Sequence, residues 1–482
     1  MNHERMPLLE ALKEYRQKNV IPFDVPGHKH GVGTIELQDF FGKELMEIDV
    51  NSMKCLDNLG NPIGVIKEAQ ELMADAFKAD EAFFLVNGTS SGVQAMIMSA
   101  CGCNDKIIIP RNAHKSAING LIMAGAKPVY VQPETNEELG IAMGISVEKV
   151  KRAIEENPDA KAVFVINPTY YGAVSDLKSI IEIAHQNNMA VLVDEAHGAH
   201  FNFNDKLPKS AMSLGADMSA VSLHKTGGSL TQSSALLLKG NKIKKNRVKS
   251  VLNMMQTTSA SYLLMASLDG ARKILVTRGE AILDNVLENV AWAREEINKI
   301  PGLYSFSKDL IDNIGVIDFD ESKLGINVCG IGMTGFQVYD ILRDEYNIQM
   351  ELGDIHNVLG IVSLGDDKHS LSSLVDALKD IEKKYRTNKF YCKGVVLENP
   401  EVILSPREAF YSEKEVVKLK DSIGRISGEY IMAYPPGIPI LSPGEKITRE
   451  IIAYIEILKE QHSILIDTED PYVNEIKVIV KS

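Results

Sequence analysis

Between residues 82 and 240, seven short apolar runs alternate with segments of mostly helical pattern. The runs are rich in β-branched and aromatic residues, which favour strands. They read AFFLV (82–86), KIIIP (106–110), KPVYV (127–131), AVFVIN (162–167), AVLVDEA (190–196), SAVSLH (219–224) and SALLLKG (234–240). This alternation predicts an α/β fold, in which a mostly parallel, seven-stranded sheet is covered by helices.

The chain changes character on either side of this α/β part. Before the first run, apolar residues recur at three- and four-residue steps, which predicts a helix over 66–77. After Pro301-Gly302 the apolar runs become shorter, and from about residue 386 prolines are frequent. Because 482 residues exceed the length that one core usually serves, we expect several domains. They are an N-terminal arm (1–50), a large α/β domain (51–300), a smaller α+β domain (301–385) and a C-terminal domain (386–482).

Charge and apolar patterning argue against several classes of function. The chain carries 52 basic and 65 acidic residues, a net charge of −13, and has no basic block long enough to follow a nucleic-acid backbone. It has no apolar stretch of the signal-peptide or membrane-span type. Cys101 and Cys103 are one residue apart, but no second pair of ligands stands at zinc spacing. We therefore expect a cytoplasmic protein that binds neither nucleic acid, nor membrane, nor metal.

A polar segment with two glycines, NGTSSG (87–92), follows the first apolar run and precedes a helix-like segment. Ligands of parallel sheets bind at the carboxyl ends of the strands. Gly88, Thr89 and Ser90 offer backbone N–H groups, hydroxyls and the positive end of a helix at one such point, which suits a phosphate. Thr and Ser also cap helices for purely structural reasons, so this segment alone leaves both interpretations open.

Three more polar residues follow other runs. His114 comes after KIIIP, Asp194 ends AVLVD, and Lys225 follows SAVSLH and precedes two glycines that predict a tight turn. Each has an ordinary explanation: a loop histidine, a buried or solvated carboxylate, and a lysine that reaches solvent. Beside a phosphate site, however, they match the needs of pyridoxal 5′-phosphate (PLP). Asp194 can keep the ring nitrogen protonated, and Lys225 can bind the cofactor covalently.

Longer motifs, spread over almost the whole chain, resemble a known family. They are PFDVPGHKHG (22–31), LDNLGNPIGVIKEAQELMADAF (56–77), VNGTSSG (86–92), IIIPRNAHKS (107–116), VINPTYYG (165–172), VDEAHGAH (193–200), SLHKTGGSLTQSS (222–234), QTTSASYLLMASLD (256–269) and YPPGIPILSPGE (434–445). In these motifs the chain resembles the Orn/Lys/Arg decarboxylase family of fold-type-I PLP enzymes. It is most similar to the short bacterial arginine decarboxylases, which lack the N-terminal wing of the larger members.

The resemblance implies a role for each matching residue. It makes Lys225 the cofactor-binding lysine of the large domain and Asp194 the partner of the ring nitrogen. His114 stacks on the ring, His197 lies near its phenolic oxygen, and His224 lies beside the lysine. The residues around the phosphate are Gly88, Thr89, Ser90 and Ser222. The segment Thr257–Thr258–Ser259 approaches the cofactor from a second subunit, which implies a homodimer with shared active sites and allows a higher oligomer.

The implied activity is decarboxylation of a basic L-amino acid, most simply arginine to agmatine and CO2, a step of polyamine metabolism. Lysine, giving cadaverine, and ornithine, giving putrescine, are the alternatives, and a PLP aminotransferase or a non-catalytic PLP-binding protein is a more distant one. A basic side chain needs an acidic partner. Glu351 and Asp354, in MELGDIHN, are our candidates, although they can equally be ordinary exposed acids.

Overall fold

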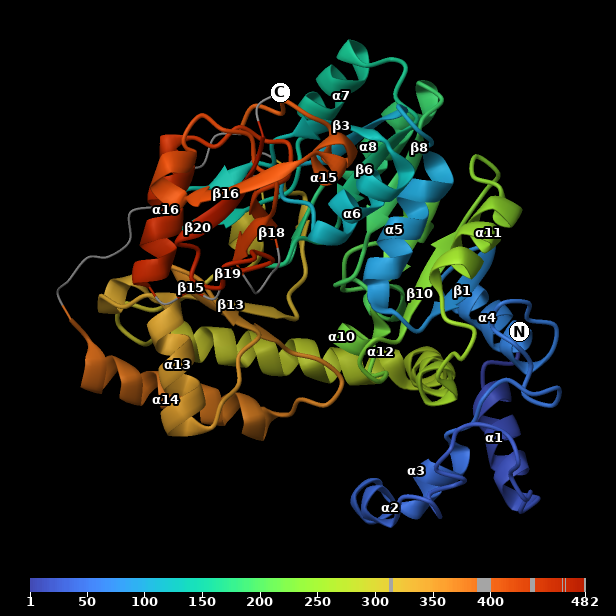
Figure 1. Ribbon diagram of the computed structural model, residues 1–482. Helices are drawn as coiled ribbons and strands as arrows, with labels where there is room; N and C mark the ends of the chain where they lie inside the picture. Colours follow the sequence, from blue (N-terminus) through green and yellow to red (C-terminus); the bar gives the residue numbers. More distant parts are fainter. Residues whose placement is uncertain (312–314, 388–399, 434–437, 462, 464, 481–482) are drawn as a thin grey trace. The chain divides into compact units, whose positions relative to one another are not determined.

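The computed structural model describes residues 1–311, 315–387, 400–433, 438–461, 463, 465 and onward to 480 (Figure 1). The chain forms two compact units. Unit 1 comprises residues 1–99 and 192–283, and unit 2 comprises residues 100–191 and 284–482. These units do not test the four domain boundaries expected from the sequence, which stay a prediction.

Seven strands form one sheet in the order β1-β10-β9-β8-β6-β2-β3. Pairing is parallel for β2 with β3, β2 with β6 and β8 with β9, and antiparallel for β10 with both of its neighbours. The mostly parallel, seven-stranded sheet is therefore confirmed. The strands are β1 (Glu81–Leu85), β2 (Lys106–Pro110), β3 (Lys127–Val131), β6 (Ala162–Ile166), β8 (Ala190–Asp194), β9 (Met218–Val221) and β10 (Ser234–Leu238).

Four of the strands, β6, β8, β9 and β10, are shorter than their apolar runs suggest, and two of these matter for the site. β8 ends at Asp194, before Glu195 and Ala196. β9 ends at Val221, and a one-turn helix, α10 (Leu223–Thr226), follows it. The expectation of strand over 222–224 is wrong, because the backbone there turns to make helical hydrogen bonds. Both corrections concern strand ends that carry candidate site residues.

The helices of unit 1 include the one predicted over 66–77, which is α4 (Val65–Ala76). It forms because Ile66, Ala69, Leu72 and Met73 share one buried face. The other helices are α1 (Pro7–Gln17), α2 (Ile35–Phe41), α3 (Lys43–Ile48), α5 (Gly88–Ala100), η1 (Phe201–Phe203), α9 (Ala211–Leu214), α11 (Lys245–Met255) and α12 (Tyr262–Asn298), which continues into unit 2.

A buried ion pair on α12 holds the start of the chain. The guanidinium of Arg272 donates a 2.7 Å hydrogen bond to Asp269, and both side chains are fully buried. Arg272 also donates to the carbonyls of His3 and Arg5, while Asp269 accepts from the backbone N–H of Leu8 at 3.0 Å. These hydrogen bonds attach the N-terminal residues to α12. Removal of either charge would leave the other one buried without a partner charge, so we expect it to be strongly destabilising.

Unit 2 begins with helices and short strands that accompany β2, β3 and β6. A four-stranded antiparallel sheet, β11-β13-β15-β14, follows, and its core is shared with the end of α12 and with α13 and α14. This arrangement confirms a smaller α+β part. The elements are β4 (Thr135–Asn136), β5 (Ile141–Ala142), β7 (Ala173–Val174), β11 (Tyr304–Ser305), β12 (Asp318–Phe319), β13 (Lys323–Asn327), β14 (Leu352–Gly353), β15 (Asn357–Ile361), α6 (Lys115–Ala124), α7 (Val147–Glu156), α8 (Leu177–Gln186), η2 (Lys308–Leu310), η3 (Cys329–Ile331), α13 (Gly335–Tyr346) and α14 (Lys368–Tyr385).

The last part of unit 2 is a C-terminal module with its own buried apolar cluster. Two small antiparallel sheets, β16-β20 and β18-β17-β19, are joined by helices and turns. The elements are α15 (Pro406–Tyr411), β16 (Lys414–Lys418), η4 (Leu419–Ser422), β17 (Ile431–Ala433), β18 (Ile438–Leu441), α16 (Arg449–Glu460), β19 (Leu465–Ile466) and β20 (Glu475–Ile479). Within the described ranges of the chain, no helix has the length and apolar content needed to cross a bilayer.

Candidate active site

Lys225 lies in the helical turn α10, directly after β9. Its backbone N–H donates to the carbonyl of Ser222 at 3.0 Å, and Gly227 donates to Leu223 at 2.7 Å, so the tight turn expected here is a one-turn helix. The half-buried side chain of Lys225 places Nζ 2.9 Å from Nε2 of His197. The sequence-predicted lysine and one of the predicted histidines are therefore in direct contact.

Asp194 is the last residue of β8 and is buried. Its Oδ1 accepts a 3.2 Å hydrogen bond from the N–H of Ala196. Burial raises the pKa of Asp194, while the charge of Lys225 and the Ala196 hydrogen bond partly oppose that rise. A cationic group of a ligand beside Asp194 would offset the cost of burying the carboxylate charge. A protonated ring nitrogen is such a group.

Three buried hydroxyls meet at the start of α5. Thr89 hydrogen-bonds to Ser222, and its Oγ1 donates to Oγ of Ser234 at 3.0 Å. Gly88, the first residue of α5, has φ +70° and open space where a Cβ would be. Gly92 lets α5 pack closely on the sheet, because a Cβ there would lie 2.8 Å from Leu85. Hydroxyls gathered at the N-terminus of a 13-residue helix form an anion-binding arrangement.

The remaining predicted residues of unit 1 are His224, Ser90, Thr257 and Thr258. Nδ1 of His224 donates to the carbonyl of Ser233 at 3.0 Å, which fixes its ring against the start of β10. Ser90 is exposed on the first turn of α5, and Thr257 and Thr258 are exposed just after α11. An exposed position suits the predicted approach of Thr257 and Thr258 to a second subunit.

His114 belongs to unit 2, where it is the N-cap of α6. Its Nδ1 accepts from the N–H of Ser116 at 3.2 Å and lies 2.8 Å from the hydroxyl of the same residue. Because Nδ1 is an acceptor, the neutral ring carries its proton on Nε2. Histidine is not a common N-cap, and its use here fixes the ring orientation as well as the helix start.

Glu351 and Asp354 also belong to unit 2, on either side of β14. Glu351 accepts a 2.7 Å hydrogen bond from the hydroxyl of Tyr170. Asp354 accepts from the hydroxyl of Tyr171, from the backbone N–H groups of His356 and Asn357 at 2.7 Å each, and from the Asn357 amide. Neither acid is exposed, and Asp354 already has a full set of donors within its own loop. Glu351 therefore has more capacity left than Asp354 to accept hydrogen bonds from a ligand.

One residue of the candidate site, Ser234, and one buried acid beside Asp194 in the chain, Glu195, went unnoticed in the sequence. Ser234, the first residue of β10, completes the hydroxyl cluster through Thr89. Glu195 follows Asp194, is buried, and accepts from the N–H of Ala211 at 2.8 Å and from the hydroxyl of Ser219 at 2.7 Å. Burial raises the pKa of Glu195 to about 8. The only sequence signal was a second acid next to Asp194, and nothing in the pattern says that it points inward.

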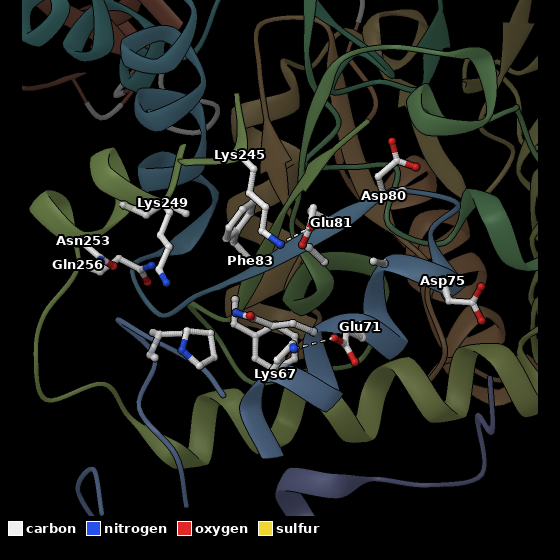
Figure 2. Close-up of a pocket in the computed structure, with 18 of the residues that line it drawn as sticks. Lys67, Glu71, Asp75, Asp80, Glu81, Phe83, Lys245, Lys249, Asn253 and Gln256 are labelled. Carbon is white, nitrogen blue, oxygen red and sulfur yellow. Dashed lines mark hydrogen bonds and ion pairs between the residues drawn. The ribbon is translucent and has the colours of Figure 1, made fainter. Parts of the chain in front are cut away.

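A cavity of about 600 Å³ lies elsewhere in unit 1, along the edge strand β1 and between α4 and α11. Figure 2 shows Lys245 directed at Glu81 and Lys67 directed at Glu71, so these four charged groups form two ion pairs. None of the predicted site residues lines this cavity; Gln256, next to Thr257, comes nearest in sequence. Its charges offer no cofactor-binding arrangement.

The residues of unit 1 fit PLP on chemical grounds. The hydroxyl cluster and the first turn of α5 suit a phosphate, buried Asp194 suits a protonated ring nitrogen, and Lys225 is an amine within reach of the same strand ends. Across the described portion of the chain, no group of three or more His, Cys, Asp or Glu side chains could hold a metal ion.

Two models of the same family match this chain, one over residues 6–370 and one over residues 389–465. The family model described as "Orn/Lys/Arg decarboxylase, major domain" matches residues 6–370, and that described as "Orn/Lys/Arg decarboxylase, C-terminal domain" matches residues 389–465. The arginine decarboxylase of Bacillus subtilis is 45% identical over 459 residues, 94% of each chain. The arginine decarboxylase of Halalkalibacterium halodurans is 46% identical over 456 residues, 94% of this chain and 93% of the relative.

The fold is shared with larger enzymes. The constitutive lysine decarboxylase of Escherichia coli superposes with a TM-score of 0.85 at 22% identity, over 99% of this chain and 82% of that one. The family matches and the relatives at 44–46% identity show that the chain belongs to the Orn/Lys/Arg decarboxylase family and is a PLP-dependent decarboxylase, and the structural likeness shows the fold, which is fold type I.

Proposed function

We propose that the enzyme converts L-arginine to agmatine and CO2. The observation that carries this proposal is the 44–46% identity, over more than nine-tenths of this chain, with four relatives named arginine decarboxylase. The structural likeness to lysine decarboxylases supports the fold alone, because identity there is only 22–24%. Lysine and ornithine remain the alternative substrates.

The proposed roles of the residues follow from their geometry. PLP, when bound, supplies an aldehyde that reacts with amines and a ring that accepts electrons. Lys225 is the amine that holds the cofactor, and its 2.9 Å contact gives His197 a position from which to accept or return a proton. Asp194 keeps a proton on the ring nitrogen. Its burial makes that interaction strong, because little water competes for the carboxylate.

Binding and orientation fall to other side chains. We assign phosphate binding to Thr89, Ser222 and Ser234 with the first turn of α5, and Ser90 to its outer edge. His224, whose ring is fixed by the Ser233 carbonyl, is next to Lys225 in the chain, and we assign it a place beside that lysine. Bound PLP would weaken the bond between Cα and the carboxylate of the substrate, and these side chains would hold the substrate in place for that reaction.

For the basic end of the substrate, Glu351 is the stronger of the two candidates. Its hydrogen bond from Tyr170 orients one carboxylate oxygen, while the oxygens of Asp354 are used by its own loop. A carboxylate oriented in this way can accept two parallel hydrogen bonds from a guanidinium, which a compact ammonium cannot supply. This assignment is a proposal about the far end of the substrate only.

We further propose a homodimer with shared active sites, located in the cytoplasm. Large apolar side chains are exposed along the N-terminal residues, including Ile21, Phe23, Val32 and Phe40, with exposures of 77–95%. Such a concentration is unusual on the surface of a monomer and suits burial against a second copy. Sedimentation of the active enzyme tests this, and a fully active monomer at assay concentration contradicts it.

The activity is tested by product analysis. Purified enzyme with PLP is given an equimolar mixture of arginine, lysine and ornithine, and amines and CO2 are quantified, with Lys225→Ala as the control. We expect agmatine and CO2 in equal amounts from the wild type and neither from the variant. Pyridoxamine phosphate with an oxo acid would instead identify an aminotransferase, and bound PLP without turnover a binding protein.

A further inference from the structure

The contact between Lys225 and His197 joins two elements of unit 1. Lys225 lies in α10, which follows β9, whereas His197 lies in the loop that follows β8. Nζ of Lys225 is 2.9 Å from Nε2 of His197, and the histidine is 5% exposed. Because a hydrogen bond weakens steeply when its length or angle changes, this contact requires that the loop after β8 be fixed closely relative to β9.

Glu195 fastens this loop to β9 in two ways. Its Oε2 accepts a 2.7 Å hydrogen bond from the hydroxyl of Ser219, a residue of β9. Its backbone N–H donates to the carbonyl of Ala220 at 3.1 Å, directly after the last paired residues of β8 and β9. The side chain and the main chain of one residue thus bind the strand that leads to Lys225.

The other polar groups of Glu195 hold the loop itself. Oε1 accepts from the N–H of Ala211, the first residue of α9, at 2.8 Å. The carbonyl accepts from the N–H of Gly198 at 2.9 Å, which closes a turn over residues 195–198 that contains His197. The turn also packs tightly on the Glu195 side chain, because a Cβ on Gly198 would lie 2.7 Å from Cγ of Glu195. Every polar group of Glu195 therefore helps to fix the turn that carries His197.

The chemistry of Glu195 points to position rather than to charge. Its side chain is 1% exposed, and burial raises the pKa of the carboxyl to about 8, so this carboxyl is mostly neutral near pH 7. Burial of a polar group is unfavourable unless its hydrogen bonds are made. Here those bonds connect β9, α9 and the loop, so the geometry of the loop depends on them.

We propose that Glu195 is a positioning residue that holds His197 against the amine of Lys225, by fastening the turn 195–198 to β9 and α9. This inference rests on the proposed role of Lys225 as the cofactor-binding amine, whereas the contact that it explains is a feature of the structure itself. Glu195 acts on Lys225 only through His197.

Three variants separate hydrogen bonding from charge and from the stability of α9. Glu195→Met nearly keeps the length of the side chain and loses both of its hydrogen bonds. Glu195→Gln also lacks the charge, but it keeps an acceptor for Ala211 N–H and gains a donor for the Ser219 hydroxyl. The matched control is Ser210→Ala, which removes the side-chain N-cap of α9 on Ser213 N–H and leaves Glu195 intact.

The first measurement uses the apo enzyme and needs no turnover. The lysines are acylated with a trace of acetic anhydride, and mass spectrometry gives the labelling rate of Lys225 relative to the exposed Lys18. We expect Lys225 to be labelled about threefold faster or more in Glu195→Met, the size expected when an amine loses one hydrogen bond. Glu195→Gln and Ser210→Ala should label Lys225 at the wild-type rate.

A double-mutant cycle tests whether Glu195 acts through His197. His197→Phe keeps a flat ring but removes the ring nitrogens, so it should itself speed the labelling of Lys225. Adding Glu195→Met to His197→Phe should then change the labelling rate no further, because the contact that Glu195 supports is already absent. Independent, additive effects of the two substitutions would overturn the inference.

The second measurement uses the loaded enzyme. In Glu195→Met, kcat for amine formation should fall about tenfold while KM changes less than about twofold, because a misplaced proton-transfer group acts on the reacting state more than on substrate binding. Glu195→Gln should recover most of kcat, since it restores the hydrogen bonds. A loss confined to KM would contradict the proposed positioning of His197.

The outcomes separate this inference from the proposed function. Wild-type labelling of Lys225 in Glu195→Met overturns the inference, as does equally fast labelling in Glu195→Gln or Ser210→Ala, which would indicate an effect of charge or of α9. If Glu195→Met does not fold, Ser219→Ala, which removes one of the two side-chain bonds, decides by the same labelling. A wild-type enzyme that forms no amine overturns the proposed function and leaves the labelling results valid.

Discussion

Replacing Glu195 by Gln should change how the stability of the enzyme depends on pH. Glu195 is 1% exposed, and burial raises the pKa of its carboxyl to about 8, against the opposing effects of its hydrogen bonds from Ser219 and Ala211. In the unfolded chain the same carboxyl has a pKa near 4.5. Between these values the folded protein therefore holds a proton that the unfolded chain releases.

The sign of the effect follows directly. Because the folded pKa is the higher one, Glu195 contributes stability that is complete below about pH 4.5 and is lost as the pH rises toward 8. The loss is about 1.4 kcal/mol for each pH unit in that range and on the order of 5 kcal/mol in total. A glutamine keeps an acceptor for Ala211 N–H and cannot ionise, so the variant should not lose this stability.

The assay is urea unfolding of wild type and Glu195→Gln at pH 5, 6, 7 and 8, followed by circular dichroism. Taking the difference at each pH cancels the titration of other groups. We expect the variant to gain stability relative to the wild type steadily as the pH rises. Ser219→Ala is the informative companion, because it removes a hydrogen bond that lowers the pKa of Glu195 and should move the loss to higher pH. Parallel curves for wild type and Glu195→Gln would refute the reasoning.

Three further predictions concern the cofactor. Borohydride reduction should fix PLP on Lys225, and Lys225→Ala should fold but lose the covalent label; a label on another lysine contradicts the assignment. Asp194→Asn should lower kcat/KM by roughly 10²–10³-fold with PLP still bound, since it removes a preorganised ionic contact, and near-normal turnover would exclude this role. Thr89→Val, which keeps the shape but loses the hydroxyl, should weaken PLP binding about tenfold or more, whereas unchanged affinity would remove Thr89 from the phosphate site.

The sheet was predictable from the sequence because its central strands are buried and therefore read as continuous apolar runs. KIIIP (106–110) is a strand with the predicted bounds, and four of its five residues are buried. The edge strand KPVYV (127–131) also has the predicted bounds, although only Val131 is buried there. The ends of strands were less predictable. Lys225 continues the apolar run SAVSLH in sequence, but local helical hydrogen bonds override the strand preference of the residues before it.

Candidate site residues could be proposed from the sequence where one residue type suits one chemistry, and less well where tertiary contacts decide which residues meet. A lysine, an acid and a hydroxyl-rich helix start on successive strand ends pointed to Lys225, Asp194 and Thr89. Ser234 was missed because we looked for site residues after the carboxyl ends of parallel strands. Ser234 instead begins β10, which runs antiparallel to both of its neighbours. Glu195 was missed because only its burial distinguishes it from a solvated acid.

The measurement that tests the central claim most directly is the comparison of kcat/KM for arginine, lysine and ornithine under identical conditions. A site that hydrogen-bonds one head group leaves buried acceptors unpaired with another, so one substrate should dominate. We expect arginine to exceed both others by more than tenfold, which corresponds to about 1.4 kcal/mol of transition-state preference. A tenfold preference for lysine or ornithine would contradict the arginine assignment, and an absence of CO2 from all three would contradict the proposed reaction itself.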